Sequence, residues 1–240
     1  FSKRILKRIF SNGRFDHGGR FYRTWWHNVP SEYRKYITID GKRTCEYDYS
    51  QLNPHMVYFL VDKDMGKEDA YGRVFDGDHR DIVKEAFNAM IQSTTTLNHK
   101  PQGIDLSGVG FDWPTLKQAI LDAHKPIQDM FFKGHGNYLQ YTDSCIAENV
   151  MLNFIRVEDA PVLPVHDSFI MHYAYGELGE LEEEMRKSFH GHFKKSIAVK
   201  EEIGVILPSS FDNKEWDDLS FEEQVHGPVE YSQWEDRNPR

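Results

Sequence analysis

The sequence predicts an α+β fold, in which an antiparallel sheet is built from hairpins and helices pack on one side of it. β-branched and aromatic residues flank the dipeptide Asp40-Gly41, a strong signal for a two-residue hairpin turn. A second apolar run, 161–172, is interrupted by His166-Asp167-Ser168. Between these two segments apolar residues recur at helical spacing, so strands and helices do not alternate regularly.

Local patterns predict the remaining elements. Residues 2–10 carry apolar side chains at helix-like spacing, and the three glycines of 11–22 predict a loop or a strand with tight turns. Asn53-Pro54 predicts a helix cap followed by the first helical residue. Pro126 predicts a kink or break in the helix 113–132. Other segments are expected to be helical (54–63, 79–92, 143–158 and 176–195), a loop (94–112) and a last strand (199–207).

Composition and charge limit the class of protein. The chain has 240 residues, of which 39% are hydrophobic and 14% aromatic, which suits a folded protein with a sizeable core. A net charge of −9 argues against nucleic acid as a partner, but the charges are unevenly placed. Residues 1–24 hold seven Lys or Arg and one Asp, whereas 205–240 hold nine carboxylates and three basic residues. One end could meet phosphates, and the other would repel them.

No stretch approaches the ~20 apolar residues of a membrane span, so no membrane partner is expected. The first residues lack the apolar core and cleavage site of a signal peptide and lack an initiator Met, so we expect a piece of a longer protein. Cys45 and Cys145 lie far apart without CxxC spacing, which argues against a zinc site or a disulfide scaffold and suits the cytoplasm.

Two carboxylates stand where apolar strands end. Asp48 closes the strand after the Asp40-Gly41 turn, and Asp167 interrupts the run 161–172. Because an unpaired buried charge is costly, Asp167 either sits at a bend open to water or holds a cation. Asp48 could equally be a helix cap or strand-end residue. Two such carboxylates can share two Mg²⁺ ions about 4 Å apart, the arrangement used for phosphoryl transfer.

Two further patterns suit phosphates. Arg80 and Lys84 lie four residues apart on the helix 79–92 and so share one face, which suits a triphosphate, although such pairs are often only a solvated face. Asp16, Gly19 and Arg20 have D-x-x-G-R spacing, in which glycine lets the backbone approach a phosphate and Arg forms forked contacts. The following FYRTWW mixes aromatics with basic residues, as in surfaces that stack bases.

These motifs, in order, resemble the palm and fingers of the family A polymerases, which comprise the bacterial DNA polymerase I group and the single-subunit phage RNA polymerases. The similarity spans about residues 10–175 and rests on D-x-x-G-R, DYSQL (48–52), RDIVK (80–84) and VHDS (165–168). It implies template-directed extension of a primer 3′-hydroxyl with nucleoside triphosphates, by a compact enzyme of a phage or mobile element. The implied partners are DNA primer–template, or RNA, and the nucleotide.

The resemblance also implies a role for each matching residue. Asp48 and Asp167 are the expected ligands of two Mg²⁺ ions, with Mn²⁺ as an alternative, and Lys84 is the expected proton donor to the leaving pyrophosphate. Expected nucleotide contacts are Arg80, Lys84, Gln51, Asn53 and Asn88. Expected nucleic-acid contacts are Arg20, Asp16, Gly19, His166, Asp143 and Asn149, with helix capping as the alternative for Asp143 or Ser144.

The chain also departs from the family pattern. Asn53 stands where the DNA enzymes have a Glu that blocks a ribose 2′-hydroxyl. Asn88 and Gln92 replace an aromatic or Met and a Tyr on the fingers helix, and Ser168 follows Asp167 as in the phage RNA polymerases. DNA synthesis is favoured over RNA synthesis or priming, because DYSQ is the DNA-type motif. A degenerate core that only binds nucleic acid, or an unrelated α+β hydrolase, are the competing interpretations.

The expected domains follow the motifs. Residues 1–60 form the first part of the palm, 61–142 a helical fingers region, 143–208 the second part of the palm, and 209–240 an acidic tail with anchoring aromatics. No complete thumb is visible in the sequence. We expect a thumb, where one is used, to come from an upstream domain or a separate subunit.

Overall fold

The computed structural model describes residues 2–203 and has the predicted α+β architecture. A five-stranded antiparallel sheet has β4 (Lys42–Tyr49) at its centre, between β6 (Ser168–His172) and β7 (Val199–Ile203). β3 (Thr38–Ile39) and β5 (Leu163–Val165) complete it, on β4 and β6 respectively. A separate two-stranded ribbon is formed by β1 (Lys7–Phe10) and β2 (Gly18–Tyr22). The acidic tail expected at 209–240 lies outside the described residues.

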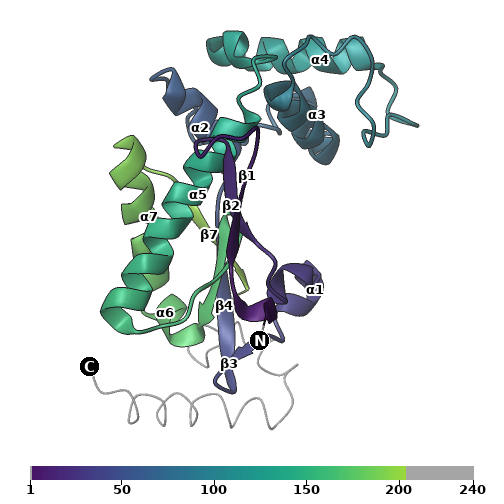
Figure 1. Cartoon of the computed structure of the whole chain (residues 1–240). Helices are drawn as coiled ribbons and strands as arrows, with labels where there is room; N and C mark the ends of the chain where they lie inside the picture. Colours follow the sequence, from purple (N-terminus) through teal and green to yellow (C-terminus); the bar gives the residue numbers. More distant parts are fainter. Residues whose placement is uncertain (1, 204–240) are drawn as a thin grey trace.

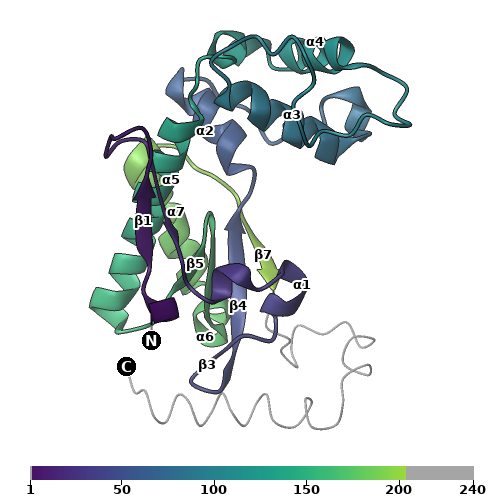
Figure 2. The same cartoon turned by 45° about the vertical axis from the view of Figure 1, so that its right-hand side comes forward.

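Helices cover one side of the sheet (Figure 1). The long helix α5 (Gly136–Asn153) lies between the β1–β2 ribbon and α7 (Glu180–Phe193), and α6 (Tyr173–Glu177) packs on β4. The short α1 (Ser31–Arg34) lies on the other side of the sheet (Figure 2). At one end of the sheet, α2 (Leu52–Leu60) leads to a helical region with α3 (Arg80–Gln92) and α4 (Trp113–Ala123).

Local chemistry explains where several elements turn or end. Asp40 and Gly41 have φ values of 53° and 74°, the left-handed pair that a tight hairpin requires, and this predicted turn is confirmed. The side chain of Asp112 accepts a hydrogen bond from the Thr115 nitrogen at 3.0 Å and so caps α4. The predicted break at Pro126 is also confirmed, because α4 ends at Ala123 and a 3₁₀ segment follows at Lys125–Met130.

Three predictions of local structure were wrong. Residues 2–10 form a 3₁₀ turn and strand β1, not a helix, because β1 pairs with β2. The helix α2 begins at Leu52, with Gln51 in left-handed conformation before it, so Asn53 is a first-turn residue and not the cap. The helix expected from residue 143 begins at Gly136, which places Asp143 and Ser144 in its interior and excludes the capping alternative.

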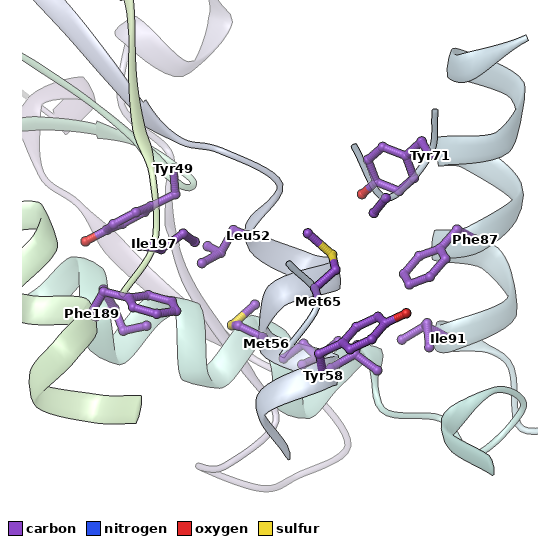
Figure 3. Close-up of a cluster of buried hydrophobic side chains, with 14 of the residues drawn as sticks. Tyr49, Leu52, Met56, Tyr58, Met65, Tyr71, Phe87, Ile91, Phe189 and Ile197 are labelled. Carbon is purple, nitrogen blue, oxygen red and sulfur yellow. The ribbon is translucent and has the colours of Figure 1, made fainter. Parts of the chain in front are cut away.

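One continuous apolar core joins the sheet to the helical region (Figure 3). Tyr49 and Phe189 pack at the sheet side, Met56 of α2 lies in the middle, and Phe87 of α3 lies at the far side. Each fully buried side chain of this size contributes about 1.5–3 kcal/mol. The core therefore fixes α3 relative to the end of β4, which is where the candidate site lies.

Candidate active site

The two aspartates lie together at the end of β4. In the antiparallel pairing of β4 with β6, Asp48 is opposite Ser168, so Asp167 is the residue just before this pair. The Tyr49 nitrogen donates a hydrogen bond to the Asp167 carbonyl oxygen at 3.4 Å. The turn 166–167 between β5 and β6 thus brings Asp167 beside Asp48, as the sequence predicts.

Successive side chains of β4 point to opposite faces of the sheet. The Tyr47 hydroxyl donates to the Gly176 carbonyl oxygen at 3.4 Å, and the Tyr49 hydroxyl to the Met185 carbonyl oxygen at 2.5 Å, so both face the helical layer. Side chains of a strand alternate between its faces, so Glu46 and Asp48 point to the opposite face. A cavity of about 360 Å³ opens there, lined by both residues together with Asp167.

The carboxyl group of Asp48 is buried among other carboxylates. Burial, and then the charges of Asp167, Glu202 and Glu46, raise the pKa of the Asp48 carboxyl to about 8, while Lys84 acts in the opposite direction. The Asp48 Oδ1 atom is buried and accepts no hydrogen bond from the residues that the structure describes. An orphaned carboxylate oxygen among other carboxylates is suited to a hard divalent ion with oxygen ligands.

The expected metal site contains few protein ligands. No group of three or more His, Cys, Asp and Glu side chains within residues 2–203 is arranged to hold a metal. An ion at Asp48 and Asp167 would therefore take its other ligands from water and substrate. This fits Mg²⁺, which usually binds through one or two carboxylates plus substrate phosphates.

The helix α3 carries the two predicted cations, Arg80 and Lys84, outside the lining of this cavity. The charge of Lys84 favours the ionised form of Asp48, as the smallest of the five effects on the pKa of that carboxyl, and Lys84 is exposed. It makes no hydrogen bond or ion pair with any residue of 2–203. The Arg80 Nε donates to Asp69 Oδ2 at 2.8 Å, and its guanidinium lies 5.4 Å from the centre of the Tyr71 ring. Arg80 is therefore held in place, and Lys84 is available to a ligand.

The remaining nucleotide candidates join α2 to its neighbours. The Asn53 Nδ2 donates to Asn88 Oδ1 at 3.2 Å, so the two positions that depart from the family pattern touch each other. The Gln51 Oε1 accepts from the Ala70 nitrogen at 2.5 Å. The Gln51 side chain thus anchors the segment before α3, and the amide pair of Asn53 and Asn88 joins α2 to α3.

The structure places the residues of the D-x-x-G-R motif in different surroundings. Asp16 lies near the tip of the ribbon, where a hydrogen bond from Arg14 lowers its pKa to about 2. Gly19 has a φ of 84°, and a Cβ there would lie 2.9 Å from the Phe10 ring and 3.1 Å from the Ser144 hydroxyl. Close packing against β1 and α5, rather than approach to a phosphate, therefore explains this glycine.

Arg20 and Asp143 are paired with each other. The Arg20 Nε donates to Asp143 Oδ2 at 2.6 Å, and the two side chains are 17% and 2% exposed. Asp143 is thus out of reach of a nucleic acid in this structure and acts as the counter-ion of Arg20. Asn149, the other candidate on α5, is exposed.

His166 belongs to an aromatic cluster that sequence reasoning missed. Its ring centre lies 5.4 Å from that of Tyr22 and 5.8 Å from that of His27. The atoms His166 Nδ1 and His27 Nε2 are buried without a hydrogen-bond partner in the described chain. The mixed aromatic and basic FYRTWWHN stretch was the available signal. However, Trp26 within it is buried and donates to the Pro164 carbonyl oxygen at 3.0 Å, so it is a packing residue.

Glu46 and Arg34 were also missed. Both line the cavity beside the aspartates, and the Arg34 guanidinium donates to Glu46 Oε1 at 2.5 Å. A larger cavity, of about 970 Å³, lies between α2 and α7 and is lined by Gln51, His55 and Lys187 among others. We take the smaller one as the candidate site, because it contains Asp48 and Asp167.

The comparisons with known proteins point in two directions. No protein family matches the chain. The chain is 24% identical over 189 residues to a 4-deoxy-L-threo-5-hexosulose-uronate ketol-isomerase of Oceanobacillus iheyensis, a match that covers 72% of this chain and 66% of the isomerase. Its fold is similar to that of the POL domain of Pol1 from M. smegmatis, solved in complex with DNA primer–template and dNTP.

The structural similarity shows a polymerase-like fold. The TM-score is 0.53 at 15% identity, with 81% of this chain and 46% of the polymerase chain covered. The chain thus spans less than half of the Pol1 chain and 66% of the isomerase. Both relatives are enzymes, and the likeness to Pol1 at this identity concerns the fold alone.

Among residues 2–203, no helix is long and apolar enough to cross a membrane.

Proposed function

We propose that the chain is a template-directed nucleotidyltransferase, which extends a primer 3′-hydroxyl with nucleoside triphosphates by a two-metal mechanism. The observation that carries this proposal is the adjacency of Asp48 and Asp167 at the end of β4, with the charge of Lys84 from α3 acting on Asp48. The polymerase-like fold supports it, because the Pol1 domain of similar fold was solved with DNA and dNTP.

In this proposal each residue of the site has a separate role. Bound at Asp48 and Asp167, two Mg²⁺ ions would stabilise the attacking and leaving oxygens of an in-line displacement at the α-phosphate. Lys84, free of protein partners in the described chain, binds the triphosphate and donates a proton to the pyrophosphate. Arg80, oriented by Asp69, contacts the phosphates from the first turn of α3. His166, which precedes Asp167 in the turn, contacts the primer end.

DNA is the proposed product, and RNA synthesis or priming is the alternative within the same fold. The DYSQ motif at Asp48 favours DNA. The Asn53–Asn88 amide pair favours tolerance of ribose, because neither side chain carries the negative charge or the bulk of the residues it replaces.

The sequence match favours a second candidate, a sugar ketol-isomerase. Such an enzyme moves a proton between adjacent carbons and needs a base beside the substrate. This candidate leaves the adjacency of the two aspartates unexplained, so we rank it second. A non-catalytic nucleic-acid-binding core is third, because it gives no reason for the unpartnered Lys84.

Primer extension tests the proposal. A labelled primer–template is incubated with Mg²⁺ and either dNTPs or NTPs, and a template alone is included to detect priming. We expect extension that follows the template with dNTPs. Extension only with NTPs would select the RNA alternative. Binding of duplex without extension would select the non-catalytic core, and isomerisation of 4-deoxy-L-threo-5-hexosulose-uronate without extension would select the isomerase.

A further inference from the structure

A third carboxyl group, that of Glu46, is buried in the cavity of Asp48 and Asp167. Glu46 precedes Asp48 by two residues on β4, and its side chain is 4% exposed. The pairing of β4 with β7 has a bulge between Glu46 and Tyr47. Bulges of this kind commonly lie next to active sites, where they redirect a side chain.

One oxygen of Glu46 is held by two donors. The Arg34 guanidinium donates to Oε1 at 2.5 Å, and the Ser168 hydroxyl donates to the same oxygen at 2.7 Å. No residue within 2–203 donates a hydrogen bond to Oε2. Oε2 does not belong to the buried atoms that lack a partner, so it is open to water. Glu46 thus has one oxygen fixed by protein donors and one that can bind water, in a residue that lines the cavity.

Ser168 connects this carboxylate to the catalytic turn. It follows Asp167 directly and is the β6 partner of Asp48. Ser168 donates a hydrogen bond to Glu46. The Glu46 carboxylate, from the neighbouring strand β4, therefore lies next to the residue that follows Asp167. The cavity lining contains Glu46, Asp48, Asp167 and Glu202 against a single guanidinium, that of Arg34, which leaves an excess of negative charge.

We propose that Glu46 is a positioning residue for the metal at Asp48 and Asp167, acting on the ion through its bound water. Magnesium keeps several water ligands in proteins, and a fixed carboxylate oxygen is a strong acceptor for them. Arg34 and Ser168 set the orientation of the carboxylate. This inference rests on the proposed function, since it assigns Glu46 to the same metal site.

Mn²⁺ binding to the protein without nucleotide tests the inference, because it does not depend on activity. Free Mn²⁺ is measured by electron paramagnetic resonance for the wild type and the E46Q, E202Q and D48N variants. We expect E46Q to weaken Mn²⁺ binding about tenfold or more, as is typical for outer-shell partners of a metal. E202Q is the control for loss of charge alone, because Glu202 lines the same cavity and its charge acts on Asp48, but its side chain is 39% exposed. We expect E46Q to weaken binding more than E202Q, and equal losses would show that only charge matters.

The outcomes separate the two proposals. If D48N abolishes binding while folded E46Q binds Mn²⁺ like the wild type, Glu46 has only a structural role and the inference is wrong. If the wild type itself binds no Mn²⁺, the proposed function and the inference both fail. Should E46Q not fold, S168A decides. This variant keeps all four carboxylates but removes one of the two donors that orient Glu46, so an affinity about tenfold weaker supports the inference, and an unchanged affinity overturns it.

Discussion

Arg20 and Asp143, which lie 123 residues apart in the sequence, form a buried ion pair with an Nε–Oδ2 distance of 2.6 Å. It ties the β1–β2 ribbon to α5, and the charge of Asp167 acts on both partners. Burial raises the pKa of the Asp143 carboxyl, against the attraction of Arg20. The guanidinium of Arg20 therefore lies within the electrostatic influence of Asp167, in the turn between β5 and β6.

Removing one member of this pair should destabilise the protein strongly. R20M leaves the Asp143 carboxylate buried without its partner, and such losses cost about 3–5 kcal/mol. The double variant R20M/D143L removes both charges and should recover a large part of that loss. Urea unfolding at pH 7 measures the three free energies. Simply additive effects of the two substitutions would show that the pair has no coupling.

Gly19 should not tolerate a side chain. Its φ of 84° is unfavourable for alanine, and a Cβ would lie 2.9 Å from the Phe10 ring. We expect G19A to cost about 1–3 kcal/mol more than G13A. Gly13 is the matched control on the same ribbon. Its φ of 63° is also positive, but nothing lies within 4 Å of the position that a Cβ would occupy there. Equal losses in thermal unfolding would refute the packing explanation.

Lys84 should affect nucleotide chemistry without affecting the fold. K84M is expected to weaken triphosphate binding and slow the single-turnover rate together, since the charge on the phosphates grows in the transition state. Its free energy of unfolding should stay within about 0.5 kcal/mol of the wild type, because Lys84 makes no ion pair within the described chain. K187M is the control, at an exposed lysine of α7 that pairs with Glu183. An unchanged single-turnover rate in K84M excludes the role assigned to Lys84.

Asp48 should reduce the stability of the metal-free protein. Burial and the neighbouring carboxylates disfavour its charged form, so D48N should unfold at the same temperature as the wild type or higher, in the presence of EDTA. Adding Mg²⁺ should raise the melting temperature of the wild type but not that of D48N. Differential scanning fluorimetry provides both values, and an equal Mg²⁺ shift in the two proteins would count against a metal at Asp48.

A buried histidine predicts a loss of stability in acid. Burial, together with the charge of Arg73, lowers the pKa of His124 to about 4, whereas an unfolded histidine binds a proton near pH 6.5. Since the unfolded state takes up the proton first, the contribution of His124 is complete above pH 6.5. It is lost as the pH falls toward 4, at about 1.4 kcal/mol per pH unit.

Urea unfolding between pH 7 and pH 4 tests this prediction. H124Q should remove that part of the slope. The same substitution at the exposed His99 should leave the slope unchanged. Parallel pH profiles for H124Q and the wild type would contradict the assignment.

Local signals predicted the elements that carry the aspartates, because the turn at Asp40-Gly41 and the polar interruption at Asp167 are encoded by adjacent residues. The strand β1 was missed for a physical reason. The apolar pattern of residues 2–10 resembles a helix, but Ile5 and Ile9 are 60% and 41% exposed, so pairing with β2 rather than burial of an apolar face decides the structure of β1. Pattern alone could not reveal this long-range pairing.

Within the site, long-range partners were equally invisible in the sequence. Nothing near Asp143 indicates that it binds Arg20, and nothing near Glu46 indicates Ser168, which lies 122 residues away. Both contacts arise only when β4, β6 and α5 come together. The motifs predicted candidate residues for the chemistry, and the fold determines which of these candidates are available to a ligand.

Diffraction from crystals soaked with Mn²⁺ and a non-hydrolysable nucleoside triphosphate tests the central claim most directly. Anomalous scattering locates the manganese ions, and the difference density locates the phosphates. We expect two ions about 4 Å apart between Asp48 and Asp167, with the triphosphate against Lys84 and Arg80. Manganese bound elsewhere, or a nucleotide that leaves Lys84 uncontacted, would contradict it.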